Sequence, residues 1–189
     1  MKPYHHGNLE QALVAAALET IRTEGADALT LRGVGAKVGV SRTALYRHFA
    51  DKAALMGRVA AEGFRLLRAA LEEALDSPED LAAMGIAYVR FAVANEGHYR
   101  AMFGRRAAEW CRYPELMADG GSAFLVLQNA VVSGQAAGRI IPGDPEQIAC
   151  VLWATMHGVA MLTIDGHLPP DSDVARAAAT CIREGIGLP

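Results

Sequence analysis

Residues 29–49 read LTLRGVGAKVGVSRTALYRHF, and this stretch decides the fold of the N-terminal part of the chain. Thr30 and Ser41 are residue types that favour helix N-caps, and each precedes a short segment whose apolar residues have helical spacing. Gly39 separates the two segments, at a point where the chain must reverse and a positive φ suits glycine. The stretch therefore predicts a helix-turn-helix. The residues expected to form its small core are Val34, Val38, Val40, Leu45 and Phe49.

The second of these two helices should present a polar face to solvent. The side chains on that face are Arg42, Thr43, Tyr46 and Arg47, with His48 at the end of the helix. These groups can bond to phosphates and base edges, and arginine can form two hydrogen bonds to guanine in the major groove. The alternative for this cluster alone is an ordinary solvated helix face. The glycine turn, the paired caps and the local charge together favour DNA.

The charge of the chain is unevenly distributed. Residues 1–60 carry eight Lys and Arg side chains against five Asp and Glu, a net charge of +3. Because the whole chain carries −3, residues 61–189 carry −6. Residues 28–58 hold six basic side chains and one acidic side chain. A basic module on an acidic body indicates that only the N-terminal part faces a polyanion.

Residues 8 to about 58 resemble the DNA-binding domain of the TetR family of bacterial repressors. The matching segments are Leu29–Arg32, Gly39–Ser41, Leu45–Phe49 and Lys52–Leu55. The resemblance implies two groups of DNA-binding side chains. The group expected to hold phosphates is Thr30, Tyr46, His48 and Lys52. The group expected nearest to the bases is Arg42, Thr43 and Arg47, and the predicted set is completed by Arg32 and Ser41.

This stretch departs from the family pattern at two glycines and one alanine. Gly33 and Gly35 stand where the family usually has an acidic residue and alanine. Each glycine should lower the stability of its helix by about 0.5–1 kcal/mol relative to alanine. The module is therefore expected to be looser than usual when free of DNA. Ala44 can offer a base only an apolar contact.

Helical signals also dominate the rest of the chain, and strand signals are nearly absent. Asn8 is the predicted N-cap of the first helix, and Asp51 is the predicted N-cap of a long fourth helix. A less regular stretch is expected from His98 to Tyr113. Further helices are expected over residues 78–95, 114–138, 146–164 and 171–186, and a turn over residues 142–145.

The predicted fold is all-α, with an N-terminal three-helix helix-turn-helix module, a C-terminal helical bundle and about nine helices in total. The expected domains are residues 1–55, which bind DNA, and residues 56–189, which bind a ligand and dimerise. The last two predicted helices are rich in alanine and apolar residues. The family resemblance implies that they form a four-helix dimer interface. This interface would hold two helix-turn-helix modules, here called reading heads, about 34–36 Å apart.

The body also resembles a TetR subgroup with Trp, His and Gly in its penultimate long helix, here Trp153, His157 and Gly158. Residues 98–104 look like the same subgroup. Trp153 and His157 share a helix face and are candidate ligand contacts. The alternative is that Trp153 packs in the core and a backbone carbonyl satisfies His157. The remaining candidate ligand contacts, each of which could instead be a core residue, are Tyr88, Phe91, Met102, Phe103, Trp110, Phe124 and Gln128.

These features predict a dimeric regulator, most simply a repressor that a small molecule releases from a palindromic operator on double-stranded DNA. Two alternatives remain open at this point. One is an architectural DNA-binding protein with no ligand. The other is a helical enzyme of small molecules that uses His157 with Asp165 or Glu109, although no catalytic motif supports it.

Other classes of protein are disfavoured by the sequence. No apolar run reaches the roughly 18 residues of a membrane span, and no signal peptide is recognisable, so a cytoplasmic location is expected. The scattered Cys111, Cys150 and Cys181 are expected to be small buried side chains. The adjacent His5 and His6 lack further ligands, so neither a metal site nor a cofactor is predicted. Residues 2–7 form either a DNA-binding arm or a disordered one.

Overall fold

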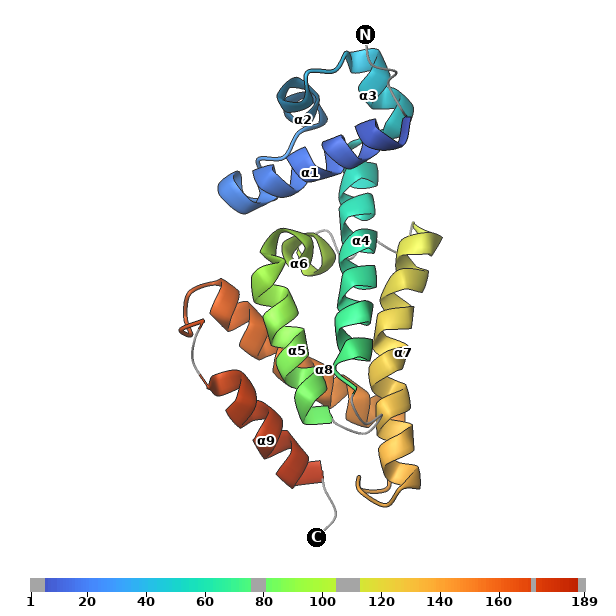
Figure 1. Cartoon of the computed structure of the whole chain (residues 1–189), viewed down its shortest axis with the longest axis vertical. Coiled ribbons are helices and arrows are strands. Elements are labelled where there is room, and N and C mark those ends of the chain that lie inside the picture. The colour runs from blue at the N-terminus through green and yellow to red at the C-terminus, as the bar shows by residue number, and fades with distance from the viewer. Residues whose placement is uncertain (1–5, 76–80, 105–112, 171–172, 187–189) are drawn as a thin grey trace. The chain divides into compact units, whose positions relative to one another are not determined.

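The computed structural model of the chain describes residues 6–75, 81–104, 113–170 and 173–186 (Figure 1). These residues form nine α-helices and no strand, so the predicted all-α fold is confirmed. The helices of the N-terminal half are α1 (His6–Glu24), α2 (Leu31–Val38), α3 (Arg42–His48), α4 (Lys52–Glu73) and α5 (Leu81–Ala94). The remaining helices are α6 (Glu96–Phe103), α7 (Pro114–Ala136), α8 (Pro145–Ile164) and α9 (Val174–Ile186).

The chain divides into two compact units, each built from two segments. The N-terminal unit comprises residues 1–63 and 96–118, and the C-terminal unit comprises residues 64–95 and 119–189. Helices α4 and α7 therefore contribute to both units. Helix α6 belongs to the N-terminal unit although α5, directly before it in sequence, belongs to the other.

The core of the N-terminal unit is formed by α1, α2, α4 and α6. Its largest fully buried side chains are Leu13, Ile21, Leu29, Val34, Leu55, Val59, Tyr99 and Met102. Two glycines allow α6 to approach its neighbours closely. A Cβ at Gly97 would lie 3.3 Å from Leu18 of α1, and one at Gly63 of α4 would lie 2.5 Å from the sulfur of Met102. This close packing holds α6 in place.

Helix α6 corrects one sequence-based prediction. The stretch from His98 was expected to be irregular, but residues 96–103 form a helix. The helix carries an ion pair of i, i+4 spacing, with Arg100 Nε 2.7 Å from Glu96 Oε1. Since Tyr99, Ala101 and Met102 are buried, tertiary packing stabilises a segment whose own helical pattern is weak.

The C-terminal unit is an apolar bundle in which α5 contacts α8 and α9, and α8 contacts α9. One core cluster consists of Val131, Ile140, Ala149 and Leu152, from α7, α8 and the loop between them. Asp144 caps α8 by accepting a hydrogen bond of 2.9 Å from the amide of Glu146, with Pro145 in the first turn. The predicted turn before α8 is therefore confirmed.

Three further predictions about single residues are wrong. Asn8 does not cap the first helix, because α1 begins at His6. Cys150 and Cys181 are exposed, because they stand on outward faces of α8 and α9. Cys111 lies outside the described residues.

Helix α8 is long and apolar enough to cross a membrane by the criteria of length and composition alone, with a mean hydropathy of 1.5. It is the one such helix within the described residues. Helix α8 packs against α5 and α9, but only 22% of this apolar window is buried within the structure.

Candidate DNA interface and effector site

Hydrogen bonds at the N-termini of α2 and α3, and at the turn between the two helices, fix the α2–α3 motif. Thr30 Oγ1 accepts a bond of 3.0 Å from the amide of Gly33, and Ser41 Oγ accepts one of 3.2 Å from the amide of Ala44. Gly39 has a φ of 74°, and its amide donates to the carbonyl of Ala36 at 3.1 Å. Both predicted N-caps and the positive φ of the turn glycine are therefore confirmed.

Gly35 turns out to have a packing role that the sequence did not reveal. A Cβ at this position would lie 3.1 Å from Cδ2 of Leu45, a buried residue of α3. The glycine thus lets α3 pack tightly on α2, which offsets part of its cost to the helix. A Cβ at Gly33 would come within 2.9 Å of the capping oxygen of Thr30. Both departures from the family pattern therefore occur at close contacts.

The small core of this motif contains fewer buried residues than predicted. Val34, Leu45 and Phe49 are buried as expected. Val38 and Val40 are only half-buried, because they flank the exposed turn at Gly39. Three apolar residues, rather than five, thus form the buried part of the predicted core.

The outward face of α3 is polar and exposed. Arg42, Thr43, Tyr46 and Arg47 are all exposed, and Tyr46 retains 47% of its accessible surface. The guanidinium carbon of Arg42 lies 5.4 Å from the centre of the Tyr46 ring. This cation–π contact restricts two of the predicted DNA-binding side chains before any ligand is bound. The arrangement leaves their hydrogen-bonding groups available on one helix face.

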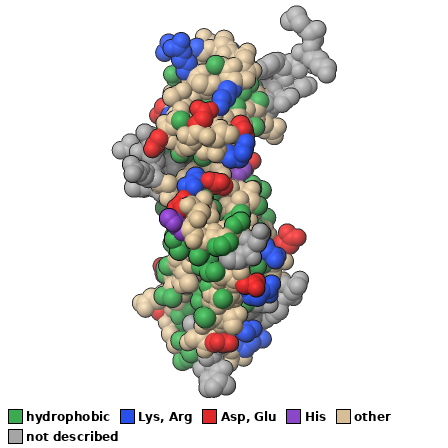
Figure 2. Space-filling view, turned by 90° about the vertical axis from the view of Figure 1, so that its left-hand side faces the viewer, with side chains coloured by type: hydrophobic (Ala, Val, Ile, Leu, Met, Phe, Trp, Pro, Cys, Tyr) green, Lys and Arg blue, Asp and Glu red, His purple; other side chains and the backbone are tan. Residues whose placement is uncertain are grey.

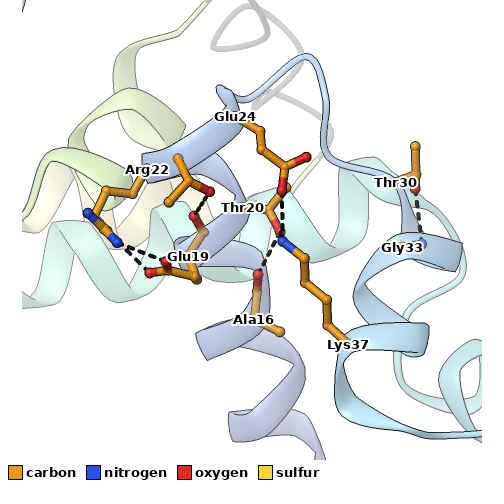
Figure 3. Close-up of polar contacts among 9 residues, drawn as sticks. Ala16, Glu19, Thr20, Arg22, Glu24, Thr30, Gly33 and Lys37 are labelled. Atoms are coloured by element: carbon orange, nitrogen blue, oxygen red, sulfur yellow. Dashed lines mark hydrogen bonds and ion pairs between the residues drawn. The ribbon is translucent and has the colours of Figure 1, made fainter.

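Two lysines brace the motif against α1 and the loop that follows it. Lys37 of α2 donates to Thr20 Oγ1 at 2.9 Å and to Glu24 Oε1 at 2.8 Å, both on α1 (Figure 3). Lys52 donates to the carbonyl of Asp27 at 3.1 Å. The sequence suggested phosphate binding for Lys52 but did not suggest this bond. The sequence does not predict the hydrogen bond between Lys37 and Thr20, because the two residues are distant in sequence.

In the C-terminal unit, three predicted effector residues meet around one hydroxyl group. Trp153 Nε1 donates to Tyr88 Oη at 3.1 Å, and Tyr88 Oη lies 3.2 Å from His157 Nδ1. The ring of Phe124 lies edge-on to Trp153 with centroids 6.0 Å apart. We name Tyr88, Trp153 and His157 the hydroxyl-centred triad. Burial lowers the pKa of His157, which favours the neutral ring.

This geometry adds to two alternatives left open by the sequence. Nδ1 of His157 lies at hydrogen-bond distance from the Tyr88 hydroxyl on α5. Trp153 is 37% exposed and so is not a fully buried core residue. The spacing of residues 153 and 157 predicted a shared face, but it could not reveal the tyrosine across from it.

Comparison with known proteins identifies the family. The family model described as bacterial regulatory proteins of the tetR family matches residues 13–59. A second model, described as the tetracyclin repressor-like C-terminal domain, matches residues 81–184, which is more than half of the chain. The chain belongs to the TetR family. It is accordingly a TetR-like DNA-binding transcriptional regulator.

Solved structures support the same architecture for this TetR regulator. A protein of unknown function from Rhodococcus sp. RHA1 is 37% identical, with full coverage of both chains and a TM-score of 0.87. A tetR-family regulatory protein from Rhodococcus RHA1 is 21% identical over 95% of this chain and 97% of its own, with a TM-score of 0.77. PfmR, a TetR regulator from Thermus thermophilus, is 20% identical over 91% and 97%, with a TM-score of 0.73. The last two show similarity of fold. No curated protein matched the chain.

The predicted effector residues of this TetR regulator do not form one group. Tyr88, Phe91, Phe124, Gln128, Trp153 and His157 lie in the C-terminal unit, whereas Met102 and Phe103 lie in the N-terminal unit. Phe91 and Met102 are buried. Trp110 and Glu109 lie outside the described residues. Within the described ranges, no three His, Cys, Asp or Glu side chains gather in a way that could hold a metal ion.

Proposed function

We propose that this TetR regulator is a cytoplasmic, homodimeric repressor that a small-molecule effector releases from a palindromic operator. Residues 1–55 would bind DNA, and residues 56–189 would dimerise and bind the effector. The observation that carries the proposal is the exposed polar face of α3, preorganised by the contact of Arg42 with Tyr46. Helices of this kind read base edges in the major groove.

The two groups of DNA-binding residues follow from this placement. Arg42, Thr43 and Arg47 would contact bases, since they share the exposed face of α3. The residues that would hold or flank phosphates are Thr30, Arg32, Ser41, Tyr46, His48 and Lys52. Lys52 would have to give up its bond to the Asp27 carbonyl in order to reach a phosphate. A charge-assisted contact to phosphate is stronger than a bond to a neutral carbonyl.

The outward face of α8 supports a dimer. Val151 and Leu162 are 63% and 46% exposed, and they share this face with Ala154 and Gly158. Open space surrounds the position of a Cβ at Gly158. No Asp, Glu, Lys or Arg occurs between Gln147 and Ile164. Small and apolar residues on an uncharged face suit close packing against a second copy of the chain.

The surface of the C-terminal unit has the same character. Figure 2 shows hydrophobic side chains gathered over the lower part of the molecule, with acidic and basic side chains mainly toward one edge. The exposed large hydrophobic residues of this unit are Leu66, Val93, Leu125, Val132, Val151, Trp153 and Leu162. Such a surface favours association over a monomeric state in water.

The hydroxyl-centred triad supports an effector site in the C-terminal unit. Tyr88, Trp153 and His157 combine aromatic surface with hydrogen-bonding groups, which is the usual chemistry of a small-molecule site. An effector that displaced one of these bonds would favour a different packing of α5 on α8. The equilibrium would then shift toward a form whose two reading heads no longer match the half-sites.

The proposal is tested by operator binding with and without effector. DNA fragments from the regulator's own promoter region are titrated at several salt concentrations, and a metabolite library is screened by thermal shift. We expect sequence-specific, salt-dependent binding, and at least one stabilising compound that weakens it. Specific binding that no compound changes would instead support an architectural protein. Affinity independent of sequence would contradict operator recognition.

A further inference from the structure

A series of four ionisable side chains links three helices of the N-terminal unit. Arg58 Nε of α4 donates to Glu10 Oε1 of α1 at 2.8 Å. Arg58 Nη1 also lies 3.4 Å from Glu62 Oε2 on α4. The other oxygen of Glu62 lies 3.8 Å from Nε2 of His98 on α6. We name these residues the Glu10–His98 relay. Within this relay, the carboxylate of Glu62 lies near both the guanidinium of Arg58 and the imidazole of His98.

His98 is the buried end of the relay. Its side chain is 11% exposed, and Nε2 has no hydrogen-bond partner among the described residues. The distance to Glu62 is too long for a hydrogen bond but short enough for a charge to be felt. A buried ring nitrogen without a partner lowers the free energy of unfolding even when the ring is neutral. It lowers that free energy further when the ring is protonated without a close counter-ion.

Nε2 of His98 has less than 1 Å² of accessible surface in this packing. A Cβ at Gly63 would lie 3.0 Å from the Cβ of His98, so α6 is in close contact with α4 beside the imidazole. On its other side, α6 contacts α1 through Gly97 and Leu18. A shift of α6 against α1 and α4 would therefore expose the unpaired nitrogen to water.

Desolvation lowers the pKa of His98, and the nearby Glu62 opposes this effect. The unfolded chain takes up a proton near the ordinary pKa of 6.5, whereas the folded chain takes it up at lower pH. Folding stability due to this group is therefore complete above pH 6.5. It is lost as pH falls from about 6.5 through the folded pKa.

The other charged groups nearby are already paired. On α6, Arg100 pairs with Glu96 at 2.7 Å, and on α1, Arg22 pairs with Glu19 at 2.8 Å. In the described ranges, Glu62 is the acidic side chain at ion-pair distance from His98. Protonated His98 would thus compete with Arg58 for a single carboxylate.

We propose that the Glu10–His98 relay is a proton-sensitive latch, in which protonation of His98 loosens α6 from α1 and α4 and weakens DNA binding. Protonation of His98 has two effects that act together. The imidazolium is poorly accommodated in its buried position, and its attraction for Glu62 draws that carboxylate away from Arg58. The regulator then responds to acid independently of any effector.

The test compares wild type with His98→Gln, Glu62→Gln and His167→Gln between pH 7.5 and 5.5. Glutamine at 98 keeps a polar group of similar reach but does not titrate. We expect the melting temperature of wild type to fall over this range by about 2–4 °C more than that of the His98 variant. Glu62→Gln should steepen the fall, because it removes the counter-ion. His167, an exposed loop residue, is the matched control and should behave as wild type.

Two further measurements localise the effect. Amide hydrogen exchange should increase in α6 at low pH in wild type and not in His98→Gln. The affinity for operator DNA should fall by roughly threefold more in wild type than in His98→Gln over the same range. Because wild type and His98→Gln are compared at each pH, effects of pH on the rest of the protein and on the DNA cancel.

The latch is contradicted if His98→Gln folds and keeps the wild-type pH dependence of melting. If His98→Gln does not fold, Glu62→Gln decides, since an unchanged or shallower slope contradicts the proposal. Melting and hydrogen exchange need no DNA or effector. They therefore remain informative even if effector-controlled repression proves wrong.

Discussion

The two units of the molecule achieve stability by different means. Eight of the ten largest fully buried side chains in the described residues lie in the N-terminal unit, and only Met84 and Val131 lie in the other. Polar bonds between helices, such as those of Lys37 and Arg58, reinforce the N-terminal core. The C-terminal unit instead leaves large apolar side chains on its surface. The proposed dimer would cover these apolar side chains with a partner, whereas the N-terminal unit buries its own.

The largest expected effect comes from opening the core of the reading head. Leu45→Ala removes a side chain that is 2% exposed and contacts Gly35. The free energy of unfolding should fall by about 2–5 kcal/mol, from lost burial and the cavity left behind. Urea denaturation followed by circular dichroism measures it. Leu66→Ala, at an exposed leucine in the other unit, is the control and should change it by less than about 0.5 kcal/mol.

A charge on the outward face of α8 tests whether the body needs a partner. Val151→Arg places a cation on a face that is 63% exposed at this residue and is proposed to be covered. The dimer dissociation constant should rise by roughly 100-fold, because a buried unpaired charge costs several kcal/mol. Sedimentation velocity measures the change. Leu66→Arg adds the same charge at another exposed apolar site, and equal effects of the two variants would argue against an α8 interface.

Removing one side chain that is proposed to contact bases should have a smaller and more specific effect. Arg42→Ala loses both the predicted contact with DNA and the cation–π contact with Tyr46. Operator binding should weaken by about 1–3 kcal/mol, with unchanged melting temperature. Fluorescence anisotropy with operator and scrambled DNA measures affinity and specificity. Arg68→Ala, at an exposed arginine paired with Glu72, is the matched control, and a similar loss there would indicate only a general effect of charge.

The smallest effect is expected at a helix cap. Ser41→Ala removes the acceptor for the amide of Ala44 and should lower stability by about 1 kcal/mol. Ser41→Gly should cost only a few tenths of a kcal/mol, because glycine is a tolerated N-cap. Thermal melts of both variants provide the comparison. No measurable loss in either variant would show that the hydroxyl contributes little to stability.

Local signals made the reading head predictable from sequence. The caps at Thr30 and Ser41 and the turn at Gly39 depend on residues within a few positions of one another, and all three are confirmed. The exposure of the polar side chains on α3 followed from the same local pattern. The assignment of individual side chains to phosphates or bases remains a prediction.

Long-range contacts explain what the sequence could not provide. Helix α6 depends on close packing at Gly63 and Gly97. The hydrophobic periodicity of the sequence does not predict these contacts. The bond between Tyr88 and Trp153 joins residues 65 positions apart. Residue type predicts that Cys150 and Cys181 are buried, but both are exposed on their helices. Each of these outcomes is decided by which helices meet.

The contact between Gly35 and Leu45 has a consequence for how such a regulator could change its target. Adding one methyl group at position 35 would force Leu45 to move by a few tenths of an ångström, because the new Cβ would lie only 3.1 Å from Cδ2 of Leu45. Leu45 anchors the helix that carries Arg42 and Tyr46. We therefore expect a substitution at position 35 to alter operator preference without changing any side chain proposed to contact DNA.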